Sequence, residues 1–114
     1  MKPLLADRLL DFGARIIALT RWPARDHALE NVLRQLARSA TSPAANYAEA
    51  REARTTRDYV HRMTICAKEL RESLVWLQLA QRAGFRQQEL PAVIQECTEL
   101  LAITLTCIKR ANSR

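Results

Sequence analysis

Glycine and proline are scarce in this sequence, with two glycines and four prolines among 114 residues. So few turn-forming residues argue against a β protein with many turns. Aromatic residues are also rare, at 5% against 48% hydrophobic residues, so a core must be built mainly from aliphatic side chains. The commonest residue types include Ala, Leu, Arg, Glu and Gln, all of which favour helix.

Long hydrophobic runs are lacking too. No uninterrupted apolar stretch approaches the roughly 18 residues needed to span a bilayer, so we expect no membrane association. Asp7, Arg8 and Asp11 interrupt the first candidate stretch, which argues against a secretory leader. We therefore expect a cytoplasmic protein.

Cysteine occurs three times, at Cys66, Cys97 and Cys107, with no CxxC pair. The number is odd, the positions are far apart, and each lies among apolar residues. This pattern predicts reduced cysteines that act as small hydrophobic core residues rather than as redox or metal sites.

Motifs of catalysis and metal binding are missing as well. The sequence has no HExxH, no Glu-x-x-His pair of di-iron bundles, no glycine-rich phosphate loop and no GxSxG. His27 and His61 have no cysteine or carboxylate at convincing ligand spacing. We therefore expect no enzymatic activity, no metal and no cofactor.

Four segments carry apolar residues at alternating steps of three and four, the period of an amphipathic helix. We expect helices over residues 4–19, from 25 or 26 to 53, from 55 or 56 to 83, and from 88 or 90 to 110. Their apolar stripes are Leu5, Leu9, Phe12, Ile16 and Leu19; Leu29, Leu33, Leu36 and Ala40; Val60, Met63, Ala67, Leu70, Leu74 and Leu77; and Leu90, Ile94, Cys97, Leu101, Thr104 and Ile108.

Caps and breakers divide these helices. Asp26 is the expected N-cap of the second helix, and Thr55 or Thr56 that of the third. Gly84 is expected to end the third helix in a left-handed conformation. Pro43 lies inside the second apolar pattern, so we expect either a kink near residues 39–42 or two helical pieces. Short connections make neighbouring helices antiparallel, which predicts a single all-α domain over residues 1–114, an up-down-up-down four-helix bundle.

The four stripes leave other apolar residues unaccounted for on the third and fourth helices. A second apolar face on a bundle helix requires further burial, and another copy of the chain is the simplest partner. A wider core that takes in these residues is the alternative. The residues expected at such a homo-oligomer interface are Ile65, Trp76, Leu79, Leu100 and Ile103.

The net charge of +6, from 18 basic and 12 acidic residues, favours polyanionic partners such as RNA or DNA. A solvated face on which arginines pair with glutamates is the alternative for any single residue. With few aromatics among them, the basic residues indicate contacts to the phosphate backbone rather than base stacking. The candidate nucleic-acid contacts are Arg34, Arg38, Arg51, Arg54, Arg57, Lys68 and Arg71.

Three stretches carry a family resemblance. They are RQLARSATSPAANYAEA at 34–50, DYVHRMTICAKELRESLVWL at 58–77 and ECTELL at 96–101. They resemble the bacterial four-helix-bundle family encoded in intervening sequences of large-subunit ribosomal RNA genes. Where the family commonly has Asn-hydrophobic-Ala-Glu-Gly, this chain has Ala50 in place of glycine, which favours a second helix that continues past Arg51.

The resemblance implies a homopentameric barrel without catalytic residues. Relatives include the accessory protein of diversity-generating retroelements, which acts with a reverse transcriptase and nucleic acid. Asn46, Glu49, Glu69 and Glu72 match recurrent polar positions of the family, and we expect them to form a network with Arg38 or Arg71 that fixes the register of the bundle or its subunits. Two functions follow: an oligomeric nucleic-acid-binding accessory protein, or a scaffold that binds another protein and no nucleic acid.

Overall fold

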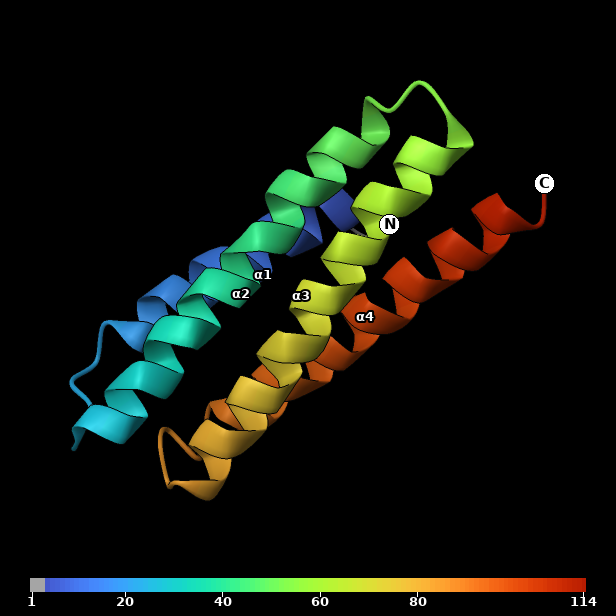
Figure 1. Cartoon of the computed structure of the whole chain (residues 1–114). Helices are drawn as coiled ribbons and strands as arrows, with labels where there is room; N and C mark the ends of the chain where they lie inside the picture. The colour runs from blue at the N-terminus through green and yellow to red at the C-terminus, as the bar shows by residue number, and fades with distance from the viewer. Residues whose placement is uncertain (1–3) are drawn as a thin grey trace.

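The computed structural model describes residues 4–114, which fold into four α-helices without a strand. These are α1 (Leu5–Thr20), α2 (His27–Arg51), α3 (Thr56–Arg82) and α4 (Leu90–Asn112). Each helix runs antiparallel to the one before it (Figure 1). The α2–α3 interface is the most extensive and the α1–α4 interface the least. The predicted all-α four-helix bundle is confirmed.

Local signals in the sequence set the helix ends. The Asp26 carboxylate accepts a hydrogen bond from the Leu29 N–H at 2.8 Å, and the Thr55 hydroxyl accepts one from the Asp58 N–H at 3.1 Å. At the end of α3, Gly84 has φ +86°, a left-handed conformation that glycine adopts without steric cost. The Phe85 N–H then donates a hydrogen bond to the Ala80 carbonyl, and the Phe85 ring is buried, as expected of this kind of cap.

Pro43 lies inside α2, which continues unbroken from His27 to Arg51. Of the two expected arrangements, the pair of separate helices is therefore wrong. The expected continuation beyond Arg51 is also wrong, because the helix ends there and the Glu52 N–H turns back to the Glu49 and Ala50 carbonyls. The Pro43 ring is buried, so the residue that lacks a backbone donor contributes its apolar surface to the core.

The core combines the predicted apolar stripes of all four helices. The largest side chains that are fully buried include Leu9, Ile16, Leu36, Met63, Leu70, Leu77, Leu90, Val93 and Leu100. Gly13 of α1 is buried against α2, where a Cβ would lie 3.4 Å from the Ala40 carbonyl oxygen, at ordinary contact distance. The burial of these side chains is the main stabilising term of the bundle.

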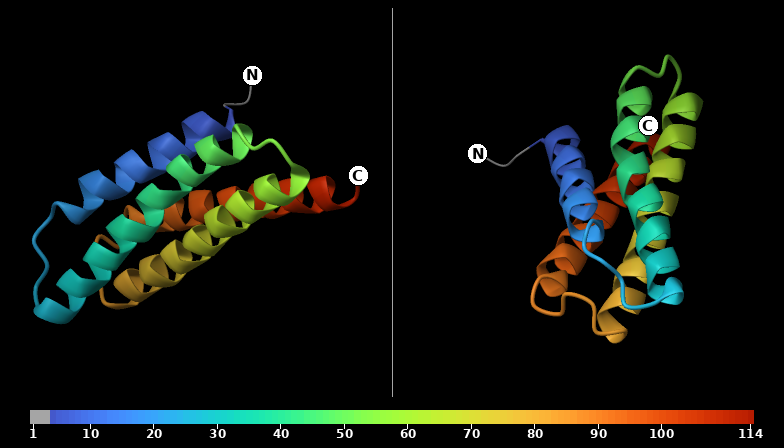
Figure 2. Two further views of the ribbon diagram at one scale, coloured as in Figure 1. Left: turned by 45° about the horizontal axis from the view of Figure 1, so that its top comes forward. Right: turned by 90° about the vertical axis from the view of Figure 1, so that its left-hand side faces the viewer.

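The helices differ in length, and this shapes one end of the molecule. α1 has 16 residues, whereas α2, α3 and α4 have 25, 27 and 23. Beyond the first turn of α1, only α2, α3 and α4 continue, and their ends meet at the α2–α3 connection (Figures 1 and 2). We call this region the three-helix end.

α4 is long and apolar enough to cross a membrane by length and composition alone, with a mean hydropathy of 1.3 in its most apolar window. The sequence analysis predicted this helix but considered only uninterrupted apolar runs, so it did not recognise that the helix meets the length and hydropathy of a membrane span. In the fold, Leu90, Val93, Cys97 and Leu100 are buried against the rest of the bundle. Because core helices of bundles meet the same criterion, the finding is weak evidence for a membrane segment.

Candidate functional site

The predicted basic residues divide into two groups in the structure. Arg34 pairs with Glu30 on its own helix at 3.1 Å, and Arg38 pairs with two glutamates of α3. The other five are Arg51, Arg54, Arg57, Lys68 and Arg71; they are exposed and have no ion pair among residues 4–114. The second group is therefore free to meet an external anion.

Arg38 joins α2 to α3 through two carboxylates. Its Nη1 lies 3.1 Å from Glu69 Oε2 and its Nη2 lies 2.6 Å from Glu72 Oε2. The hydrogen bond to Glu72 is the main reason why the pKa of Arg38 is raised above its ordinary value. Ser39 and Ser73, the residues that follow Arg38 and Glu72 in the chain, have buried hydroxyls 2.8 Å apart. We call Arg38, Glu69 and Glu72 the α2–α3 clamp.

Arg8 forms a second clamp, between α1 and α4. Its Nη2 and Nε contact Glu96 at 2.6 and 3.1 Å, and Nη2 also contacts Glu99 at 3.2 Å. The sequence interpretation missed this α1–α4 clamp. The spacing of Glu96 and Glu99 matches that of Glu69 and Glu72, but the arginine lies 88 residues from Glu96 and only the fold brings it there.

The predicted polar network is smaller than expected. Glu69 and Glu72 meet Arg38, whereas Arg71 takes no part. The Asn46 amide bonds instead to the carbonyl and hydroxyl of Ser42, one turn earlier on α2. Glu49 is exposed, and its carboxylate has no hydrogen bond or ion pair within the described chain. On α2, Asn46 and Glu49 lie about two and three turns beyond Arg38, too far along the helix to join the α2–α3 clamp.

An arginine-lined cavity of about 450 Å³ opens at the three-helix end, between the start of α3 and the last turns of α4. Its three arginines are Arg54, Arg110 and Arg114, and no Asp or Glu side chain lines it. We call it the arginine pocket. The residues that line it are Ala53, Arg54, Thr55, Thr56, Tyr59, Cys107, Arg110, Ala111 and Arg114. Of its arginines, the sequence identified only Arg54 as a candidate.

A second cavity, of about 330 Å³, lies on the other side of the α2–α3 connection. It shares Arg54 with the arginine pocket but includes Glu49, Glu52 and Asp58, so its charge is mixed. We call it the mixed pocket. Arg51 lines neither pocket, and its guanidinium packs over the Tyr47 ring at 5.9 Å. The basic junction predicted from Arg51, Arg54 and Arg57 therefore resolves into separate environments.

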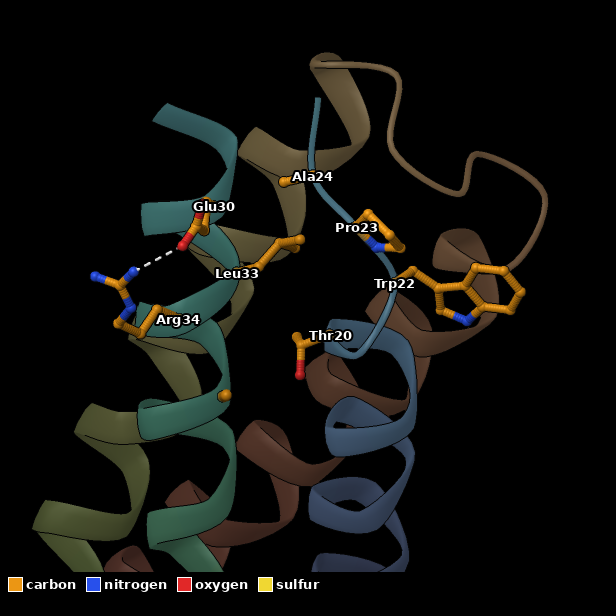
Figure 3. A pocket seen from close by; sticks show the side chains of 8 residues that line it. Thr20, Trp22, Pro23, Ala24, Glu30, Leu33 and Arg34 are labelled. Carbon is orange, nitrogen blue, oxygen red and sulfur yellow. Dashed lines mark hydrogen bonds and ion pairs between the residues drawn. The ribbon is translucent and has the colours of Figure 1, made fainter. Parts of the chain in front are cut away.

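A cavity of about 460 Å³ at the opposite end lies between the end of α1 and the start of α2 (Figure 3). Glu30 and Arg34 border it as an ion pair, opposite Thr20 and Pro23. The Trp22 ring points away from these residues and stacks on the guanidinium of Arg86 at 4.4 Å. Because its charged groups neutralise one another, this cavity offers no excess charge to a ligand.

The expected interface residues do not form one face. Leu100 is fully buried within the single chain and cannot contact another copy, so its assignment was wrong. Ile65, Trp76 and Ile103 are half-buried, whereas Leu79 is 46% exposed. Leu79 lines a shallow groove of about 220 Å³ with Val32 and Ala28 of α2. The Trp76 indole Nε1 is buried and lacks a hydrogen-bond partner in the described residues.

The three cysteines are free. Cys66 and Cys97 are buried as predicted, and burial raises their pKa to about 11 and about 12, so both remain thiols at neutral pH. Cys107 is half-buried at the arginine pocket. Within residues 4–114, no group of three or more His, Cys, Asp or Glu side chains is placed to hold a metal ion.

Known proteins resemble this chain along most of its length. The model of the 23S rRNA-intervening sequence protein family matches residues 6–106. The chain is also similar to a crystal structure described as a protein of unknown function from the S23 ribosomal protein family of Bacteroides thetaiotaomicron. The identity is 28% and the TM-score 0.83, over 93% of this chain and 99% of that one. No curated protein matches the chain.

Proposed function

We propose that this chain, which belongs to the 23S rRNA-intervening sequence protein family, is a non-catalytic, homo-oligomeric accessory protein that binds the backbone of RNA or DNA. One observation carries the proposal. Four carboxylates are held in ion pairs at the two clamps, while seven basic residues at the three-helix end have no ion pair in the described chain. These are Arg51, Arg54, Arg57, Arg62, Lys109, Arg110 and Arg114.

This distribution favours a polyanion over a small acidic molecule. Glu49, Glu52 and Asp58 offset only part of the charge at the three-helix end. Each phosphate neutralised by a Lys or Arg releases counterions, so binding grows with the number of contacts and weakens as salt rises. Such contacts read the backbone and carry little sequence information.

Self-association would multiply this basic surface, and we propose a homopentamer, as the family resemblance implies. Exposed apolar side chains on α3 support an interface between copies, since Val75 is 50% and Leu79 46% exposed. The mass of the protein in solution, measured by light scattering, tests this directly. Leu79→Glu is expected to reduce the mass, and an unchanged mass would place the interface elsewhere.

Binding is tested by fluorescence anisotropy with labelled RNA and DNA over a salt series. We expect affinity at low salt that falls steeply as salt rises, and a purified protein with excess absorbance at 260 nm. Replacement of Arg51, Arg54 and Arg57 by Gln should weaken binding more than the same change at Arg15, Arg21 and Arg82. The control triplet alters the net charge equally, at exposed positions outside the three-helix end. No binding at low salt would refute the proposal.

A scaffold that binds another protein is the second candidate, favoured by the apolar groove of Ala28, Val32 and Leu79. Its partner would contact the α2–α3 face rather than the three-helix end. Capture of partners from the native host with and without nuclease separates the two functions. A partner that survives nuclease treatment and is lost with Leu79→Glu supports the scaffold.

A further inference from the structure

We infer that the arginine pocket binds a phosphate group, which the proposed function would supply as part of a nucleic acid backbone. The pocket is assembled from separate parts of the chain. Arg54 comes from the α2–α3 connection, whereas Arg110 and Arg114 come from the end of α4. Antiparallel packing brings the α2–α3 connection and the end of α4 to the same end of the bundle (Figure 1), where these arginines line one cavity.

Its charge is unbalanced within the described chain. No Asp or Glu lines the pocket, and its three arginines form no ion pair there. A guanidinium carries its charge at any physiological pH and presents a planar fork of N–H donors that matches the oxygens of phosphate. Three such groups around one cavity suit an anion with several acceptor oxygens better than a carboxylate.

Neutral donors add to the arginines. The Thr55 hydroxyl caps α3 through the Asp58 N–H, and the N–H groups of Thr56 and Arg57 have no acceptor within the helix. The positive end of the α3 dipole therefore faces the same region. Tyr59 also lines the pocket, and burial raises the pKa of its phenol, which stays protonated at neutral pH and can donate a hydrogen bond.

A structural role explains only part of this arrangement. Arg110 lies in the last turn of α4, where a cation interacts favourably with the carbonyl end of the helix. Lys109 occupies the same turn and could serve the same purpose, yet it does not line the pocket. Arg54 and Arg114 also line this cavity. Their position there is explained neither by a capping role for Arg110 nor by the turn in which the Ala53 N–H bonds the Ala50 carbonyl.

The test compares two triple variants of equal net charge. The pocket variant is Arg54→Gln, Arg110→Gln and Arg114→Gln. The control variant is Arg15→Gln, Arg21→Gln and Arg82→Gln, which removes the same charge at exposed positions outside the pocket and away from the three-helix end. Binding to a fluorescein-labelled single-stranded RNA of roughly 20 nucleotides is measured by anisotropy between about 50 and 200 mM salt. Thermal unfolding confirms that both variants fold.

Each phosphate neutralised by the protein contributes about 0.7 to the slope of log affinity against log salt, so the pocket variant, which loses the one phosphate held in the pocket, should lose about 0.7 of the slope for each copy bound. The control variant should keep most of the wild-type slope. If both variants lose affinity and slope equally, the pocket inference is wrong while the proposed function stands, because only overall charge would then matter.

A second probe separates this inference from the proposed function. Sodium pyrophosphate is compared with sodium chloride at equal ionic strength, and the melting temperature is measured. Stabilisation of the wild type and the control variant, but not of the pocket variant, supports a phosphate site even if no RNA binds and the proposed function fails. Equal melting temperatures for all proteins in both salts, together with no RNA binding, would overturn the inference.

Discussion

The two clamps repeat one arrangement at opposite sides of the bundle. In each, an arginine of one helix binds two glutamates three residues apart on its neighbour: Arg38 with Glu69 and Glu72, and Arg8 with Glu96 and Glu99. Their surroundings differ. The side chain of Glu69 is 10% exposed, whereas those of Glu96 and Glu99 are 30% and 50% exposed.

This difference implies different roles for the same geometry. The α2–α3 clamp covers the most extensive helix interface, above the buried hydroxyls of Ser39 and Ser73. A carboxylate left without its partner there would lack both water and a cation. The α1–α4 clamp lies at the least extensive interface, where few other contacts hold the helices together. We expect the first to contribute to global stability and the second mainly to the position of α1.

The largest effect is expected for Arg38→Ala. This change leaves the nearly buried Glu69 without its cation, and should lower the free energy of unfolding by about 1–3 kcal/mol. Urea unfolding measures it. Arg34→Ala is the matched control, because Arg34 forms an exposed pair one turn away on the same helix and should cost under about 0.5 kcal/mol. Equal losses in both variants would show that the α2–α3 clamp adds nothing beyond a surface ion pair.

A smaller loss of about 1 kcal/mol is expected for Ser39→Ala, which removes a buried hydrogen bond beneath the α2–α3 clamp. The remaining Ser73 hydroxyl still donates to the Glu69 carbonyl at 2.8 Å, so no donor is stranded. Thr41→Ala, on the exposed side of α2, serves as the control. The double variant of Ser39 and Ser73 should cost less than the sum of the single changes, since both remove one shared bond.

Arg8→Ala should cost only about 0.5–1 kcal/mol globally, because water can solvate the released carboxylates of Glu96 and Glu99. Its clearer signature is local. Amide hydrogen exchange is expected to increase in α1 more than in α3, whereas Arg15→Ala should leave the pattern unchanged. Uniform faster exchange throughout the bundle would contradict a positioning role for the α1–α4 clamp.

Acid should weaken the α1–α4 clamp slightly. Hydrogen bonds from Gln95 and then from Arg8 lower the pKa of Glu99 below its ordinary value. The ionised group therefore contributes stability above its unfolded pKa of about 4.3, and this contribution is lost as the pH falls through the lowered folded pKa. Glu99→Gln should show a smaller loss of melting temperature between neutral pH and pH about 3 than the wild type. Parallel curves would show that Glu99 is not coupled to folding.

The sequence predicted the helices well because the signals for them are local. Asp26, Thr55 and Gly84 each act within a few residues of the helix end that they define. The centre of a buried face was harder to predict. On α4 the stripe with Leu101 and the stripe with Leu100 both fit a helical period, and only packing against α3 shows that Leu100 is the fully buried residue.

The candidate site was predicted only in part, for the opposite reason. Arg54 and Arg38 could be identified because other charged residues lie near them in the chain. Arg8, in contrast, binds Glu96, which is distant in sequence, and Arg110 and Arg114 share a cavity with the distant Arg54. Pattern analysis gives no distance between helix ends that meet through antiparallel packing. The separation of the arginine pocket from the mixed pocket depends on that distance.

The short α1 has a practical consequence for recombinant protein. α4 extends past it, so Arg114 lies at the rim of the arginine pocket, whereas the first turn of α1 starts on the flank of the bundle (Figure 2). A polyhistidine tag joined after Arg114 would add rings beside that cavity that gain positive charge in mildly acidic buffer, and so would change its affinity for anions. A tag placed before α1 would avoid this artefact.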